Sequence, residues 1–190
     1  IVFRELGIPT KTSKRVKSPI ALGKPLTGAE FCAPVSALHG YVASLLKETD
    51  YVFLPTYLER KPADNGGLRK FCYYSQYASA LVAQAIDEDR ILKPMVGTRY
   101  ARFQIVGELH KALASVPGRR RSFVQINAAL DKAEEFRHTV SRKRKDLYRT
   151  NRTGPETVDV VLLGRPYSVL PAEMNKGIPD IFGALGIRVF

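Results

Sequence analysis

The two cysteines, Cys32 and Cys72, are the residues of this 190-residue sequence best suited to chemistry. Each stands directly before a segment with helical periodicity, and Pro34 suits the first turn of the helix after Cys32. Backbone N–H groups and the helix dipole at such a position favour a thiolate, the form of cysteine that binds iron. Two buried, inert cysteines are the alternative, because cysteine is among the residues most often buried.

A second candidate site is the turn formed by Gly164, Arg165, Pro166 and Tyr167, which follows a strand predicted over residues 158–163. Open α/β sheets bind ligands at the carboxyl ends of their strands. An arginine guanidinium can bind a phosphate or carboxylate through two hydrogen bonds. We therefore take Gly164, Arg165 and Tyr167 as candidate cofactor-binding residues. The alternative is a tight turn in which Arg165 pairs with a nearby acidic side chain.

The three histidines offer weaker candidates. His39 lies two helical turns after Cys32, on the same side of the predicted helix, where it could contact a cluster or ligand. A hydrogen-bonded interior histidine is the more common outcome. His110 and His138 fall in predicted helices without further ligand residues nearby, so the sequence does not predict a zinc site.

Alternating helices and strands must position these residues. Apolar periodicity predicts helices at 34–47, 73–86, 102–116, 122–148 and 179–185, and strands at 51–55, 158–163 and 186–190. Residues 91–96 form a further edge strand or, because of Pro94, a loop. Residues 1–8 resemble the last turns of a helix that runs into a strand, and residues 9–30 are irregular with room for a short helix at 11–16.

The helix at 122–148 is the longest one predicted. Its apolar stripe begins at Phe123, Ile126 and Leu130 and is expected to be buried, whereas Arg142–Lys145 should be exposed.

This order of elements predicts an α/β fold of Rossmann-like parallel sheet units with a helical middle segment, truncated at both ends. We expect an N-terminal α/β unit with both cysteines at 1–90, a mainly helical segment at 91–157 and the start of a second α/β unit at 158–190. Because both termini fall within predicted elements, the chain is expected to be an interior piece of a longer protein.

Composition restricts the class of protein. Hydrophobic residues make up 45% and charged residues 25% of the chain, which is typical of globular domains. No apolar run approaches the roughly 18–20 residues of a membrane span, and no signal peptide opens the sequence. Two cysteines do not form the disulfide framework of a small secreted domain. The sequence therefore predicts a cytoplasmic protein that does not enter a membrane.

The formal net charge of +12 is concentrated in one segment. Residues 119–152 hold 11 Lys and Arg against 4 Asp and Glu, a net charge of +7. Such a band favours an acidic protein partner, a phosphate-bearing ligand or nucleic acid, or it forms a solvated helix face. Nucleic acid is disfavoured, because no recognition motif is present and no aromatic residues are interleaved with Arg119–Arg121 or Arg142–Lys145.

Several segments, in order along the chain, carry a family resemblance. They are Arg4–Ile8 with Thr12–Lys14, Glu30–Val35 with the His39-Gly40 step and the strand at 50–55, Cys72 with the Tyr, Ser and Gln residues after it, and Val160–Tyr167 with Asn175 and Gly177–Pro179. Together they resemble the activase-related proteins of the 2-hydroxyacyl-CoA dehydratase system, over nearly the whole chain.

The resemblance implies a Rossmann-like arrangement in which cysteines from different loops converge on an iron–sulfur cluster, a double cubane in some relatives. It also implies an ATP-dependent activase domain or subunit as partner, which drives low-potential electrons toward an acyl-CoA dehydratase or toward a small substrate. Relatives usually carry proline after the second cysteine, where Tyr73 stands here. They also supply at least one more cysteine from the C-terminal half, and none follows Cys72.

Two function hypotheses follow. The first is a redox domain of the activase-related family, with Cys32 and Cys72 as part of the ligand set of a cluster. A [4Fe–4S] cluster takes four ligands, so the chain alone is expected to hold no cluster and to be inactive. An oligomer of the chain is a further possibility. In this hypothesis both cysteines are reduced, follow strand ends and face one cleft. The alternative is a non-catalytic binding module whose basic helix docks an acidic or phosphate-bearing partner.

Overall fold

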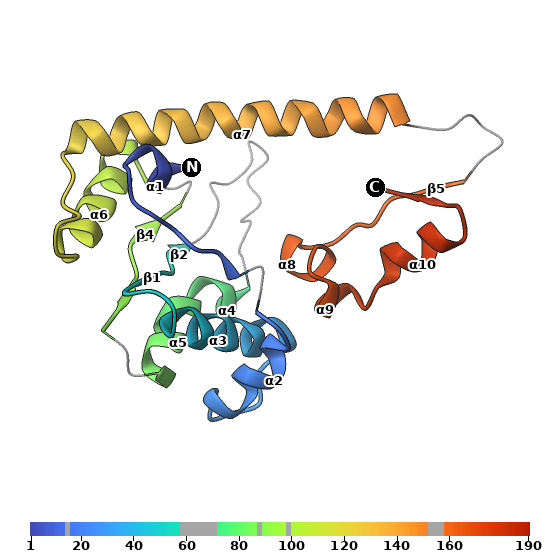
Figure 1. Ribbon diagram of the computed structural model, residues 1–190, viewed down its shortest axis with the longest axis horizontal. Helices are drawn as coiled ribbons and strands as arrows, with labels where there is room; N and C mark the ends of the chain where they lie inside the picture. The colour runs from blue at the N-terminus through green and yellow to red at the C-terminus, as the bar shows by residue number, and fades with distance from the viewer. Residues whose placement is uncertain (14–15, 58–71, 87–88, 98–99, 152–157) are drawn as a thin grey trace. The chain divides into compact units, whose positions relative to one another are not determined.

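The chain divides into two compact units, Ile1–Ala133 and Glu134–Phe190. The computed structural model describes residues 1–13, 16–57, 72–86, 89–97, 100–151 and 158–190 (Figure 1). Short parallel strand pairs and helices occur in both units, which confirms the α/β class. The strands described are paired two by two, so a Rossmann-like sheet stays a prediction.

The first unit contains most of the helices. They are α1 (Val2–Glu5), α2 (Pro19–Gly23), the 3-10 helix η2 (Lys24–Leu26), α3 (Ala33–Leu46), α4 (Tyr73–Gln76), α5 (Ala78–Ile86), α6 (Arg102–Ala114) and the start of α7 (Phe123–Asn151). Its strands are β1 (Val52–Phe53), β2 (Thr56–Tyr57), β3 (Ile91–Leu92) and β4 (Met95–Val96). The predicted strands at 51–55 and 91–96 are thus confirmed in place, although both are short.

The pairs β1–β3 and β2–β4 form one interrupted parallel ladder. Partners differ by 39 in residue number in every pair, from 52 with 91 to 57 with 96, so the register is continuous. The Leu54 N–H donates to the Leu92 carbonyl at 2.9 Å, and the Thr56 N–H donates to the Pro94 carbonyl at 3.0 Å. Between these two bonds the next donor would be the nitrogen of Pro94, which carries no hydrogen. One proline therefore divides the ladder into two short pairs.

Helices cover both faces of this ladder (Figure 1). One core joins α3 and α5 to the strands, through Val42, Leu46, Val52, Val82 and Ile91. The other core joins α6 and α7 to the chain after α1, through Leu6, Val106, Leu109, Leu113, Ile126 and Ala129. Phe53 packs against this second core, with its ring centroid 4.8 Å from that of Phe3. Adjacent strand residues point to opposite faces, so Val52 and Phe53 serve different cores.

Helix α2 was missed by the sequence analysis, and the short helix for which residues 11–16 leave room includes residues 14 and 15, which lie outside the described residues. Pro19 occupies the first turn of α2, where a proline suits a helix. The backbones of α2 and α3 touch at Gly23 and Gly40. A Cβ atom added to Gly40 would lie 2.0 Å from the Pro19 carbonyl oxygen, and one added to Gly23 would lie 1.7 Å from the Ser36 carbonyl oxygen. Only glycine permits this approach.

Helix α7 is continuous over 29 residues, as the periodicity predicts. Ile126 is fully buried and Leu130 is half-buried, but Phe123 is 52% exposed, so its expected burial was wrong. Phe123 is the first helical residue and lies against the His110 ring, at 4.5 Å, beside the core and not within it. Arg142–Lys145 are exposed, as expected.

The second unit contains the rest of α7, followed by β5 (Asp159–Val160), α8 (Pro166–Val169), α9 (Ala172–Asn175), α10 (Ile178–Ala184) and β6 (Arg188–Val189). Strands β5 and β6 are parallel and are joined by the three short helices, which confirms the predicted strands here and the helix near 179–185. The ring of Tyr148 on α7 lies edge-on to Phe190, at 5.0 Å.

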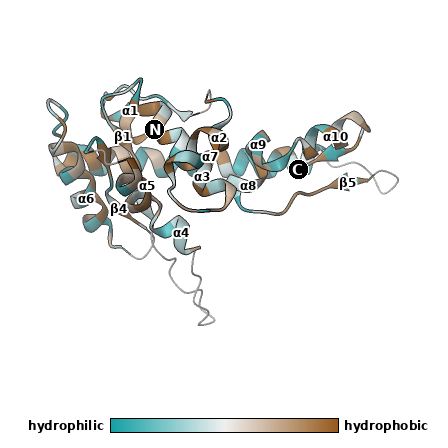
Figure 2. Ribbon diagram, turned by 90° about the horizontal axis from the view of Figure 1, so that it is seen from below, coloured by the Kyte–Doolittle hydropathy of each residue, from teal (hydrophilic) through white to brown (hydrophobic). Residues whose placement is uncertain are grey.

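The second unit is not closed over a core. Among its described residues none is buried, and Leu163, Leu170 and Leu185 are each more than two-thirds exposed. Hydrophobic residues occur along α10 (Figure 2), where Ile178 is 43% and Ile181 is 59% exposed. Because parallel strands usually bury both faces, this apolar surface is suited to further packing.

Within the described ranges, no helix combines the length and the apolar character needed to cross a membrane.

Candidate functional site

Cys32 is the N-cap residue of α3. Its backbone is extended, with φ −62° and ψ 153°, and its carbonyl accepts hydrogen bonds from the Val35 N–H at 3.0 Å and the Ser36 N–H at 3.1 Å. Pro34 lies in the first turn. The thiol is exposed and not in a disulfide. The position predicted from the sequence, at the start of a helix, is confirmed.

Cys72 has the same relation to α4. Its carbonyl accepts from the Ser75 N–H at 2.9 Å and the Gln76 N–H at 3.1 Å, and its half-buried thiol is outside any disulfide. The helix expected over 73–86 consists of two pieces, α4 and α5, which meet at Tyr77. Both cysteines are therefore reduced N-cap residues.

Aromatic side chains bring the two cysteine segments together. Phe31, next to Cys32, lies edge-on to Tyr74, two residues after Cys72, with ring centroids 5.3 Å apart. Phe31 also stacks on His39, with ring centroids 6.4 Å apart. His39 is 1% exposed, and its Nδ1–H donates to the Val35 carbonyl at 2.8 Å. It is thus an interior, hydrogen-bonded histidine that stacks on Phe31.

The expected position of Cys32 after a strand was wrong. The residues before it form α2, η2 and a bend, and β1 comes only after α3. The Gly23–Gly40 contact explains this order, because it folds the preceding segment onto α3 as a helix. Residues 58–71, which precede Cys72, lie outside the described residues.

A short bismaleimide is expected to join Cys32 to Cys72 within one chain. The reason is the Phe31–Tyr74 contact, which holds both thiol-bearing segments side by side. Intact mass and peptide mapping would identify the cross-link, and Cys32→Ser is the control that must abolish it. Phe31→Ala should lower the yield severalfold by releasing the segments. Reaction of each thiol only with separate reagent molecules would contradict the arrangement.

That the two thiols bind a metal stays a prediction. Across the described residues, no group of three or more His, Cys, Asp or Glu side chains is placed to hold a metal ion. His110 instead makes a 2.8 Å hydrogen bond with the Arg121 carbonyl, and His138 is exposed on α7. Two soft thiolates suit iron or another thiophilic metal, but they would need ligands from elsewhere to complete its coordination.

The Gly164–Tyr167 turn lies at the start of α8. Arg165 is the N-cap residue, and its Nη1–H donates to the Tyr167 hydroxyl at 2.6 Å. A Cβ atom at Gly164 would meet the Val169 Cγ1 atom at 2.5 Å, so glycine suits this close turn. Arg165 is exposed and Tyr167 is 39% exposed. The turn offers a guanidinium and a hydroxyl to solvent, and its role in cofactor binding stays a prediction.

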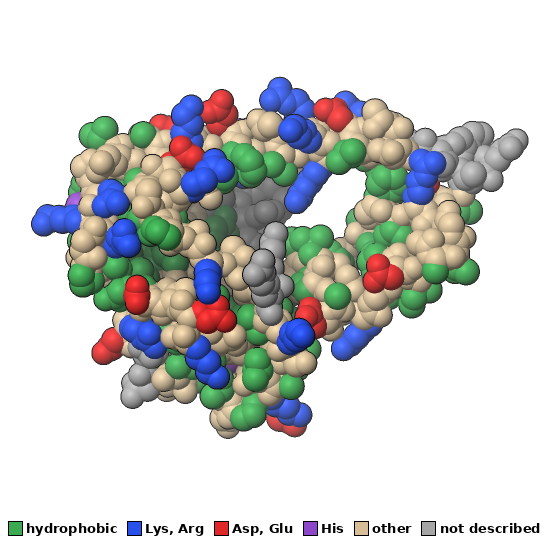
Figure 3. All heavy atoms as spheres, in the orientation of Figure 1, with side chains coloured by type: hydrophobic (Ala, Val, Ile, Leu, Met, Phe, Trp, Pro, Cys, Tyr) green, Lys and Arg blue, Asp and Glu red, His purple; other side chains and the backbone are tan. Residues whose placement is uncertain are grey.

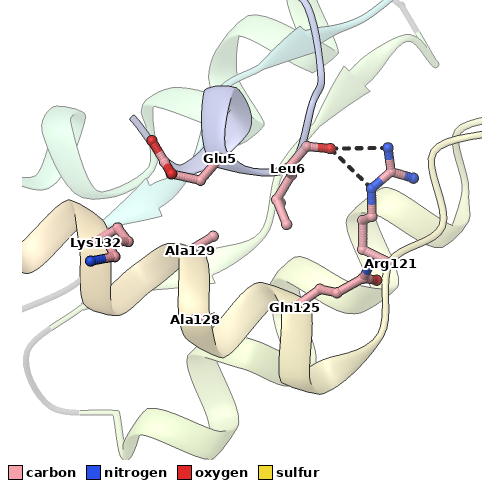
Figure 4. A pocket seen from close by; sticks show the side chains of 7 residues that line it. All are labelled: Glu5, Leu6, Arg121, Gln125, Ala128, Ala129 and Lys132. Atoms are coloured by element: carbon pink, nitrogen blue, oxygen red, sulfur yellow. Dashed lines mark hydrogen bonds between the residues drawn. The ribbon is translucent and has the colours of Figure 1, made fainter.

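One arginine with a structural role was missed by the sequence analysis. Arg121 borders a cavity of about 250 Å³ together with Glu5, Leu6, Gln125 and Lys132 (Figure 4). Its Nε–H and Nη2–H donate to the Leu6 carbonyl at 3.1 and 3.0 Å. The guanidinium therefore fastens the end of α1 to the start of α7. The sequence showed only a run of three arginines, which carries no signal for this contact.

A more open hollow of about 600 Å³ lies between α6 and α7. Its wall includes the exposed apolar side chains of Phe103, Phe123 and Val124. At its edge Arg102 donates to Asn127 Oδ1 at 2.9 Å and also pairs with Asp131. The hollow is an apolar surface beside a satisfied ion pair, with no arrangement for proton transfer or nucleophilic attack.

Comparison with known proteins places the chain in one family. The family model described as the CoA enzyme activase uncharacterised domain matches residues 1–190. No curated protein and no solved structure matches the chain. The match spans every segment that carries the family resemblance, including both cysteines.

Proposed function

Because the chain belongs to the CoA enzyme activase uncharacterised domain family, we propose that it is a cysteine-bearing redox domain in the activation of enzymes that act on CoA substrates. The supporting observation is the Phe31–Tyr74 contact, which brings together two segments that each present a reduced cysteine at an N-cap. Cysteine thiolates are the usual ligands of iron–sulfur clusters.

Cys32 and Cys72 would each bind iron through sulfur, as two of the four ligands of a [4Fe–4S] cluster. When bound, such a cluster supplies one-electron transfer at low potential. Phe31 and Tyr74 would cover the same side of the cluster and limit the access of water, which matters because solvent exposure tunes cluster potential. His39 would keep Phe31 in place through the stacking of the two rings.

The partners in this proposal are an ATP-dependent activase domain or subunit, which delivers electrons, and an acyl-CoA dehydratase or a small substrate, which receives them. Arg165 and Tyr167 are proposed to bind a phosphate of a nucleotide or CoA beside Gly164. Their guanidinium and hydroxyl are already joined by a 2.6 Å hydrogen bond and face solvent. The remaining cluster ligands would come from outside these 190 residues.

Iron and acid-labile sulfide, measured after anaerobic purification of the full-length protein, test the cluster proposal. We expect a cluster in the unaltered protein and a loss of most of it in Cys32→Ser and in Cys72→Ser, because each change removes one thiolate. Ala80→Ser, on the exposed face of α5, is the matched control and should keep the cluster. The 190-residue chain alone should hold no cluster at full occupancy.

Two results would refute parts of this proposal. A normal cluster in the double Cys→Ser variant would show that the two thiols are not ligands. A cluster at full occupancy on the monomeric 190-residue chain would show that further ligands are not needed.

A further inference from the structure

The part of α7 that belongs to the second unit is a helix without a buried face. From Glu134 to Asn151 none of its residues is buried, although the helix continues without a break. Near its end the helix meets the last residues of the chain, where Arg188 donates to the Asn151 carbonyl and the Tyr148 ring lies edge-on to Phe190. Helices are marginal in water without tertiary packing, so the segment before Tyr148 is suited to a packing partner.

An apolar stripe runs along this segment. Phe136, Val140 and Leu147 follow one another at steps of four and seven residues, and they continue a seven-residue spacing from Ile126 and Ala133. Phe136 is 49% exposed and Leu147 is 61% exposed. With 3.6 residues per turn, all three lie within about 40° of one line along the helix. A narrow stripe of this kind is typical of a helix that packs lengthwise against another helix.

The charges of the segment are sorted around this stripe. The basic residues Arg137, Lys143 and Arg144 lie about 40–60° from Val140 around the helix axis and therefore border the stripe. All three acidic residues, Glu134, Glu135 and Asp146, lie about 120–140° away. The far face also carries Arg142, Lys145 and Arg149. The border of the stripe is thus basic alone, and Lys and Arg side chains are visible along α7 (Figure 3).

We propose that residues 136–147 of α7 form a docking site for an amphipathic helix of a partner protein, with an apolar stripe bordered by Asp and Glu. The apolar line of the partner would cover Phe136, Val140 and Leu147, and its acidic border would face Arg137, Lys143 and Arg144. In helix pairs, charges that border the apolar seam set the choice of partner. This site depends on neither cysteine and holds whether or not a cluster is bound.

Two other occupants fit the surface less well. A second copy of the chain would bring two basic borders together, and like charges at such positions disfavour pairing. Nucleic acid binds basic residues through its phosphates without regard to an apolar line. It would therefore use the far-face residues Arg142, Lys145 and Arg149 as readily as the border residues. These differences define the test.

The probe is a 21-residue synthetic helix with Leu at the seam positions and Glu at the bordering positions, labelled for fluorescence anisotropy. Its reversed counterpart carries Lys in place of Glu. We expect the Glu peptide to bind the 190-residue chain at least about tenfold more tightly than the Lys peptide in physiological salt, from three favourable border pairs. Equal binding of both peptides, or binding of neither, would overturn the proposal.

Matched charge variants locate the site. Arg137→Ala, Lys143→Ala and Arg144→Ala together should weaken binding of the Glu peptide by about tenfold. The far-face set Arg142→Ala, Lys145→Ala and Arg149→Ala removes the same charge and should change binding by less than about threefold. Alanine favours helix in both sets, and circular dichroism would verify that α7 is kept. Equal losses of affinity in the two variants would mean that the Glu peptide is attracted by positive charge anywhere on α7, and would refute the proposed site.

Leu147→Ala distinguishes an acidic partner helix from a second copy of the chain and from nucleic acid. It should weaken binding of the Glu peptide by about tenfold, since the leucine side chain would be buried against the apolar line of the peptide. Sedimentation of the unaltered chain and of Leu147→Ala would reveal a dimer that depends on the stripe, and a short DNA duplex would reveal phosphate binding. A stripe-dependent dimer, or DNA binding tighter than that of the Glu peptide, would overturn the choice of partner.

Discussion

A Gly40→Ala chain is expected to be strongly destabilised in its first unit. The new methyl group would lie 2.0 Å from the Pro19 carbonyl oxygen and 2.9 Å from the Gly23 nitrogen. Both neighbours are backbone atoms, so no side chain can rotate aside. Overpacking in a close-fitting interior usually costs about 1–3 kcal/mol, and a clash with backbone that forces α2 away from α3 should cost about 3 kcal/mol or more.

Loss of the α2–α3 contact would also disturb the residues of the candidate site. Helix α3 begins at Cys32 and carries His39, which stacks on Phe31. A shift of α3 would therefore disturb the Phe31–Tyr74 contact that unites the two cysteine segments. We expect the yield of the Cys32–Cys72 cross-link to fall together with stability in Gly40→Ala.

Gly107→Ala is the matched control. Gly107 also lies inside a helix, α6, but no atom comes within 4 Å of its added Cβ. Alanine should raise the free energy of unfolding there by about 0.5–1 kcal/mol, because glycine weakens a helix interior. Urea denaturation followed by circular dichroism would compare the two variants. A loss below about 1 kcal/mol in Gly40→Ala would show that α2 does not pack on α3 as described.

The elements with strong local signals could be predicted from the sequence. Helices α3, α6 and α7 follow apolar periodicity, and their bounds differ from the predicted ones by a few residues at most. The strands were located but overestimated in length, because the paired length of a strand depends on the strand beside it. In this ladder Pro94 removes one hydrogen-bond donor from the middle. Helix α2 has too few residues for a period. It is stabilised by contact with α3, which no local pattern displays.

For the candidate site as well, local features could be predicted from the sequence and long-range contacts could not. Both cysteines could be placed before helices, because Pro34 and the apolar periodicity after each cysteine are local features. The meeting of Phe31 with Tyr74 depends on residues 43 positions apart, and sequence patterns within one window do not report it. The same holds for Arg121, whose carbonyl partner Leu6 is 115 residues away. The His39-Gly40 step was noted in the sequence, but its physical reason is the α2–α3 contact.

Ile126→Ala is the second substitution with a large expected effect. Ile126 is fully buried and joins α7 to Leu6 and to the α6 residues Val106 and Leu109. Truncating an isoleucine in such a core costs about 2–5 kcal/mol, because apolar contacts are lost and a cavity stays behind. The free energy of unfolding, measured by urea denaturation, should fall by that amount. The start of α7 should also pack less well against α6.

Val124→Ala is the control that separates the effect of burial at Ile126 from the effect of helix propensity. Val124 is also β-branched and lies two residues away on the same helix, but it is 78% exposed. Alanine favours helix over either β-branched residue by a few tenths of a kcal/mol, so this gain is shared by both variants. Val124→Ala should therefore stay within about 0.5 kcal/mol of the unaltered chain. Similar losses in the two variants would mean that α7 is rotated about its axis, with the side that carries Val124 turned toward the core in place of Ile126.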